Sequence, residues 1–172
     1  MRYVVLLRGI NVGGHHSLPM QDLRDILESL GHEDVKTYIQ SGNVVLSAST
    51  QPDGAAISAA VESRFGFSPR VLVVPGPAFA AVAEANPYKD EAAEPKHLHI
   101  WFLAEPASPD LDAMEACRAP SERFTLSANA LYLYAPDGIG RSKFAANAEK
   151  LMGVDGTGRN LNTVGKILGL LA

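Results

Sequence analysis

Apolar and polar positions in the first half of the chain alternate between strand and helix patterns. Residues 3–7 are continuously apolar, which is typical of a strand buried on both faces. Between Pro19 and Gly31, apolar residues recur at helical spacing. Short strand patterns at 35–40 and 44–47 flank Ser41-Gly42-Asn43, which predicts a tight hairpin. A helix that begins after Asp53 and a strand at 70–74 complete the order βαββαβ, and this order predicts a ferredoxin-like fold with 3–7 as its central strand.

The second half resembles the first in its order of elements. An Ala-rich helix ends near residue 85, and the Pro-containing polar stretch 86–96 predicts a surface connection. A strand at 97–103, a helix at 110–117, a hairpin of 123–126 with 130–134, and helices at 142–152 and from 162 follow. We therefore expect an α+β protein with a ferredoxin-like subdomain at 1–85 and a related βαββαα subdomain at 86–172, in which the last strand is missing.

Composition and charge exclude several classes of protein. The chain has 172 residues, 47% apolar and 20% charged, and its net charge of −4 disfavours broad nucleic-acid binding through phosphate neutralisation. The single Cys117 cannot form an internal disulfide, which fits a reducing compartment. The N-terminal apolar run is too short for a signal segment, and no run is long enough to span a bilayer. We expect a cytoplasmic protein with no membrane partner, and its oligomeric state stays open.

A glycine-rich loop after the first strand is the first candidate for chemistry. Arg8 stands at the end of the strand, and Asn11, Gly13 and Gly14 follow it. Backbone amides in such a loop can converge on an anion, and the start of a helix adds partial positive charge. The loop fits neither the Walker nor the dinucleotide-binding spacing. The alternative is a tight turn in which Gly13 and Gly14 supply positive φ and Arg8 pairs with a carboxylate.

A basic, amide-rich segment near the end of the chain is the second candidate. From residue 139 onward, five basic residues (Arg141, Lys143, Lys150, Arg159, Lys166) face two acids (Glu149, Asp155). An Arg159 guanidinium can bind a phosphate or a carboxylate, and Asn162 and Lys166 stand one helical turn apart. The alternative is that Asn160 or Asn162 caps a helix and the remaining side chains are solvated.

Aromatic residues of the second half form a third candidate. Alternation places His97, His99 and Trp101 on one face of their strand, and Tyr132 and Tyr134 on one face of theirs. Paired strands could present these rings as a stacking platform, and the alternative is core packing. The two histidines lack the further ligands of a metal motif, so we expect neither a metal nor a cofactor.

Two groups of motifs resemble one known family. Residues 8–14, 19–20, Leu23 and 38–45 are similar to the opening of a bacterial family known only as a domain of unknown function, number sixteen-ninety-seven. Residues 132–134, Gly138, 142–143 and 157–166 are similar to its end, except that Leu161 stands where we expect the family to carry Trp. The resemblance implies a two-part α+β fold of ferredoxin-like character and no established activity.

Three hypotheses of function follow from these residues. The first is a binding module for a small anionic ligand, phosphate-bearing or nucleotide-like, and its site residues are Arg8, Asn11, Gly13, Gly14, Asn43, Arg159, Asn160, Asn162 and Lys166. The second is an acylphosphatase-like hydrolase of phosphate esters or acyl phosphates, in which Arg8 holds the phosphate and Asn43 positions water; it rests on fold-level analogy. The third is a module that binds a protein partner through the aromatic face of its sheet. Whether the chain is an enzyme, and which residues would be catalytic, stays open.

Overall fold

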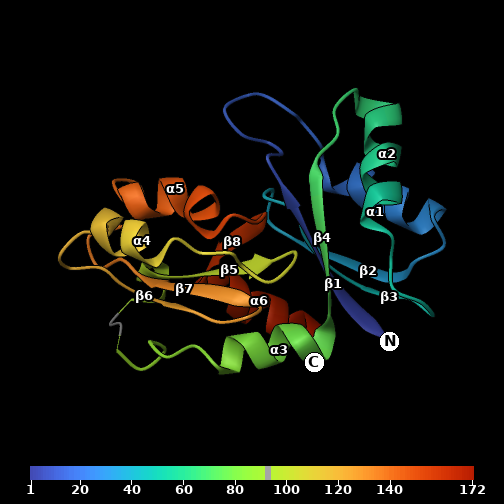
Figure 1. Ribbon diagram of the computed structural model, residues 1–172. Helices are drawn as coiled ribbons and strands as arrows, with labels where there is room; N and C mark the ends of the chain where they lie inside the picture. The colour runs from blue at the N-terminus through green and yellow to red at the C-terminus, as the bar shows by residue number, and fades with distance from the viewer. Residues whose placement is uncertain (92–93) are drawn as a thin grey trace. The chain divides into compact units, whose positions relative to one another are not determined.

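A computed structural model describes residues 1–91 and 94–172 (Figure 1). It divides into two compact units: residues 1–81 with 165–172, and residues 82–164. The described residues form two four-stranded antiparallel sheets and six α-helices. The α+β class and the ferredoxin-like arrangement are therefore confirmed. The domain boundary after residue 85 stays a prediction.

The first unit contains the predicted βαββαβ order. Its elements are β1 (Arg2–Arg8), α1 (Met20–Ser29), β2 (Glu33–Tyr38), β3 (Asn43–Ser47), α2 (Gly54–Phe65) and β4 (Arg70–Pro75). The sheet has the order β2-β3-β1-β4, so β1 is hydrogen-bonded to β3 on one side and to β4 on the other. The prediction that residues 3–7 form a central strand is confirmed.

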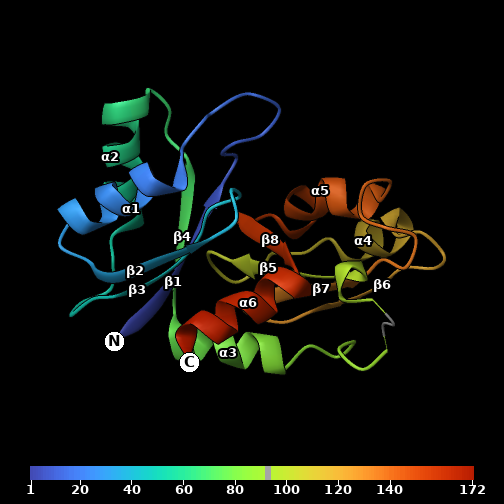
Figure 2. The same ribbon diagram turned by 180° about the vertical axis from the view of Figure 1, so that it is seen from behind.

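Local sequence explains where the elements of this unit begin and end. The Asp53 carboxylate accepts a hydrogen bond from the amide of Ala55 at 2.9 Å and caps α2. Gly66 ends that helix at φ 80°, in the left-handed conformation that glycine adopts without strain. Helices α1 and α2 lie on one face of the sheet (Figures 1 and 2), and residues of both pack with Tyr3, Val5 and Leu7.

Helix α3 (Gly76–Glu84) follows β4, and α6 (Leu161–Leu171) ends the chain. The last residues of α6 belong to the first unit. There, Nη1 of Arg2 donates hydrogen bonds to the carbonyls of Leu170 and Leu171 at 3.1 and 3.2 Å. This guanidinium satisfies carbonyl groups that have no partner within the helix and places positive charge at its C-terminus.

The second unit repeats the topology of the first. It contains a 3₁₀ turn (Pro95–His97), β5 (Leu98–Leu103), α4 (Leu111–Cys117), β6 (Arg123–Leu126), β7 (Ala130–Tyr134), α5 (Lys143–Met152) and β8 (Gly156–Asn160). The sheet order β6-β7-β5-β8 corresponds to β2-β3-β1-β4 of the first unit. The expected absence of a last strand is wrong, because β8 pairs with β5 from Gly156 to Asn160.

Candidate functional site

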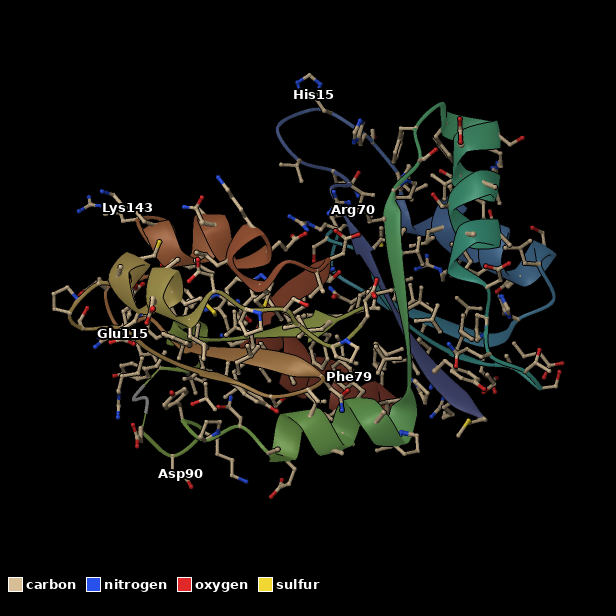
Figure 3. The ribbon with its side chains drawn as sticks, viewed as in Figure 1. His15, Arg70, Phe79, Asp90, Glu115 and Lys143 are labelled. Carbon is tan, nitrogen blue, oxygen red and sulfur yellow. The ribbon has the colours of Figure 1, made fainter. Side chains whose placement is uncertain are left out.

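Arg8 lies opposite a second arginine that the sequence analysis did not select. In the antiparallel pairing of β1 and β4, Arg8 faces Arg70 directly, and both residues are exposed. Side chains at directly opposite positions lie on the same face of a sheet, with Cβ atoms roughly 5 Å apart. Figure 3 labels Arg70 at the start of β4, beside the end of β1. The structure therefore places two arginines at directly opposite positions on one face, at one end of the first sheet.

Asn43 lies on the same face of this sheet as Arg8, opposite the position two residues earlier along β1. It pairs with Leu6, which precedes Arg8 by two residues and so shares its face. The side chain is fully buried, and its Nδ2 donates to the carbonyl of Tyr38 at 2.9 Å and to Oγ of Ser41 at 3.0 Å. Both amide hydrogens are thus used to hold the β2–β3 turn. Asn43 therefore holds the turn through its side-chain amide.

The glycine-rich loop is a small hairpin. Val12 and His15 bond to each other through both backbone groups, at 3.2 and 2.9 Å, and Gly13 and Gly14 between them have φ of 57° and 76°. Two positive φ values define a type I′ turn, which explains both glycines. Helix α1 begins only at Met20, so the amides of Gly13 and Gly14 belong to a hairpin turn and not to the first turn of a helix. Anion binding by this turn stays a prediction.

Asn11 connects this loop to the β2–β3 turn. Its Nδ2 donates to the carbonyls of Leu18 and Gln40 at 2.9 and 2.8 Å, and its Oδ1 accepts from the amide of Leu18 at 2.8 Å. The ring of His16 stacks on Phe67 with 4.6 Å between centroids, and His16 Nδ1 lies 2.9 Å from the carbonyl of Gly9. These contacts fix the loop, while His15 points outward at its tip (Figure 3). Asn11 therefore connects the glycine-rich loop to the β2–β3 turn.

The C-terminal candidates lie on β8 and α6. Nη1 of Arg159 donates to the carbonyl of Gly158 at 2.9 Å, within the half-buried strand. Asn160 caps α6, since its Oδ1 accepts from the amide of Thr163 at 3.0 Å. This cap is the alternative that the sequence analysis gave for Asn160. Asn162 and Lys166 are exposed and lie one turn apart on α6.

Comparison with known proteins supports the resemblance seen in the motifs. A family model described as "Protein of unknown function (DUF1697)" matches residues 1–132. The chain belongs to this family. The match includes the glycine-rich loop and the β2–β3 hairpin, whereas the motifs at 138, 142–143 and 157–166 lie beyond it. No curated protein matches the sequence.

A solved structure agrees with the fold over nearly the whole chain. It is "the structure of conserved bacterial protein SP0830 from Streptococcus pneumoniae", with a TM-score of 0.71 and 24% sequence identity. The alignment covers 99% of this chain and 98% of that one. At this identity, the likeness shows the fold alone. In the part of the chain that the structure describes, no helix is long and apolar enough to cross a membrane.

The stacking platform of the second unit is absent, and that interpretation was wrong. Trp101 pairs with Leu131 on β7, so it shares a face with the leucines and not with Tyr132 and Tyr134. The indole is 7% exposed and packs with residues of α4 and α5. On the other face, the hydroxyl of Tyr132 donates to the carbonyl of Val82 at 2.7 Å, and burial raises the Tyr132 pKa. Trp101 is therefore a core residue, and the hypothesis of an aromatic docking face loses its basis.

A hollow of about 400 Å³ in the second unit is another place where a ligand can be sought. Its lining includes Cys117 at the end of α4 and Arg141, Ser142 and Lys143 at the start of α5. Arg118 also lines it, but this guanidinium is bonded to Glu115 and to the carbonyl of Glu122 at 2.9 Å. Acidic groups from Glu122 and Asp137 lie in the same wall. The wall of this hollow therefore carries both positive and negative side chains.

Two features of the first unit were missed by the sequence analysis. The first is Arg70, which the ferredoxin-like order could have revealed, because that order places the first and last strands side by side. The second is Ile39, whose φ of 50° no sequence signal indicates. No group of three or more His, Cys, Asp or Glu side chains that could hold a metal occurs within residues 1–91 and 94–172.

Proposed function

We propose that this protein binds a small anionic ligand, phosphate-bearing or nucleotide-like, at the end of the first sheet where Arg8 and Arg70 meet. The observation that carries the proposal is the register of β1 and β4, which sets these two arginines directly opposite each other. Two arginine side chains on one face of a sheet can both donate charge-assisted hydrogen bonds to the same anion.

The neighbouring loops give this end of the sheet its shape. Asn11 bonds to the β2–β3 turn through the carbonyl of Gln40 and so connects it to the glycine-rich loop. Asn43 bonds to the carbonyl of Tyr38 at the start of the same turn. In the proposal, Arg8 and Arg70 bind the anion, the amides of Gly13 and Gly14 supply further donors, and the two asparagines keep the donors in place. Arg159, Asn160, Asn162 and Lys166 are the candidates from the end of the chain, and Asn160 caps α6. Their part in anion binding stays a separate prediction.

Binding is favoured over hydrolysis. The hydrolase hypothesis assigned the attacking water to Asn43, and the burial of Asn43 together with its two amide hydrogen bonds speaks against that role. No other observation favours a second function.

Titration calorimetry with pyrophosphate and with ATP tests the proposal. Arg8→Ala and Arg70→Ala should each weaken binding by about 10- to 100-fold, because each removes a charge-assisted interaction of roughly 1.5–3 kcal/mol. Arg64→Ala is the matched control, since it removes the same charge from α2, where Arg64 pairs with Asp22 at 3.4 Å. Lys143→Ala tests the hollow of the second unit.

The pattern of losses decides the outcome. Unchanged affinity in both Arg8→Ala and Arg70→Ala would refute the site, and a loss confined to Lys143→Ala would place the ligand in the second unit. Arg8→Ala should leave the melting temperature of the free protein within about 2 °C of the wild type. A fall well beyond that would assign Arg8 a structural role instead.

A further inference from the structure

Ile39, in the turn between β2 and β3, has a backbone conformation that its side chain disfavours. Its φ is 50°, and a β-branched residue rarely adopts positive φ because its side chain crowds the backbone. The side chain is 49% exposed, so core packing does not account for its presence. Such strain persists only where the surrounding structure imposes it, and it is concentrated at functional sites.

The surroundings of Ile39 do impose this conformation. The carbonyl of Gln40 accepts a hydrogen bond from Asn11 at 2.8 Å, and the carbonyl of Gly42 accepts one from the amide of Leu7 at 2.9 Å. Gly42 is so close to the first strand and its loop that a Cβ there would lie 2.8 Å from Leu7 Cβ and 2.9 Å from Ile10 Cδ1. The turn is therefore held in place at both ends.

The turn lies next to the two arginines. Because Leu6 pairs with Asn43 and Leu7 bonds to Gly42, the β1 residue that follows, Arg8, lies beside the β2–β3 turn on one side and Arg70 on the other. Figures 1 and 2 both show this turn beside the end of β1 from which the glycine-rich loop leaves. That loop exposes a second apolar side chain, Val12, with 63% of its surface accessible.

We infer that the Ile39 turn, with Val12, binds the apolar part of the ligand whose anionic group lies at Arg8 and Arg70. The ligand class is then an organic phosphate with a flat or aliphatic body, and not inorganic phosphate alone. A rigid turn that exposes an apolar side chain gains contact area without an ordering cost on binding. This inference rests on the proposed anion site and adds specificity to it.

Phenyl phosphate and inorganic phosphate separate the two contributions, because they share an anionic head and differ in the ring. The wild type should bind phenyl phosphate at least about fivefold more tightly, since shielding even a few CH or CH₂ groups has an effect of that size. Ile39→Asn should weaken the binding of phenyl phosphate by about fivefold and change the affinity for inorganic phosphate by less than twofold. Asn tolerates positive φ, so the melting temperature should not fall.

Leu111→Asn is the matched control, because Leu111 is 58% exposed on α4 and far in sequence from the loops. It should change neither affinity. Equal binding of the two phosphates by the wild type, or an equal loss of both in Ile39→Asn, would overturn the inference about the apolar contact. If Arg8→Ala still weakens the binding of both phosphates, the proposed anion site is supported even though the apolar contact is not. If Arg8→Ala and Arg70→Ala weaken the binding of neither phosphate, the proposed function itself is refuted.

Discussion

His99 is a buried histidine whose ring makes an incomplete set of hydrogen bonds. It is 7% exposed, between Leu133 on β7 and Asn160 on β8, and its Nδ1 is buried without a hydrogen-bond partner among the residues that the structure describes. Burial lowers the pKa of His99 to about 4, with a smaller contribution from His97. The protein therefore folds with this imidazole neutral, and protonation favours the unfolded chain.

The stability of the fold should consequently depend on pH through His99. Since the folded pKa is lowered, the unfolded state binds the proton first, and stability should fall as pH decreases from about 6.5 to about 4. The loss is on the order of 3 kcal/mol at the acidic end, as a shift of one pKa unit corresponds to about 1.4 kcal/mol. Urea unfolding at a series of pH values should show this slope in the wild type and a weaker one in His99→Leu.

A second histidine provides the control for this measurement. His15→Gln changes an exposed residue at the tip of the loop and should leave the pH dependence as it is in the wild type. If the free energy of unfolding depends on pH in the same way in the wild type and in His99→Leu, His99 is not the cause of the pH dependence.

Single residues were also where sequence reasoning was least complete. Glycine, proline and capping residues have local causes, so the sequence predicted Asp53, Gly66 and the glycine pair of the loop. The roles of Asn11 and Asn43 depend on partners in neighbouring turns. The strain at Ile39 is imposed by contacts between loops, and no pattern in its own segment indicates it.

Among the elements, β8 is the strand that the sequence analysis did not predict. Its residues, Gly-Thr-Gly-Arg-Asn, have no apolar alternation and two glycines, which usually weaken a strand. The structure explains the glycine at 158: a Cβ there would lie 2.9 Å from Cε2 and Nε1 of Trp101. The indole therefore lies against the backbone of β8, and the missing side chain makes room for it. The information that specifies this strand is partly in Trp101 of the neighbouring strand.

Gly158→Ala should for that reason destabilise the second unit. The added methyl group must displace the Trp101 ring, which is buried, and overpacking of this kind costs roughly 1–3 kcal/mol. Gly169→Ala is a matched control on α6, where an added Cβ meets no atom within 4 Å. It should stabilise the helix by up to about 1 kcal/mol. Thermal and urea unfolding measure both, and an unchanged stability in Gly158→Ala would contradict the proposed packing.

At the scale of the whole molecule, the two units have the same order of strands and helices. The apolar periodicity was sufficient to predict the first unit and most of the second, because each buried strand and each amphipathic helix carries its own pattern. The sheet order then follows from the ferredoxin-like topology, which sets the first strand of each unit between the third and the fourth. The proposed site was only partly predictable from the sequence. Arg70 becomes a candidate only when the register of β1 and β4 is known, because that register sets it opposite Arg8.

The prediction that concerns the whole chain is the number of anions that it binds. If Arg8 and Arg70 bind the same anion, calorimetry with pyrophosphate should give one site per chain, and Arg8→Ala and Arg70→Ala should each weaken binding. The double variant should then lose less affinity than the two single losses together, with an interaction energy of about 0.5–3 kcal/mol, because both groups contact the same anion. Arg141→Ala, which removes an exposed arginine of the second unit, is the control and should bind as the wild type does. Two sites per chain, or strictly additive losses in the double variant, would contradict a site shared by Arg8 and Arg70.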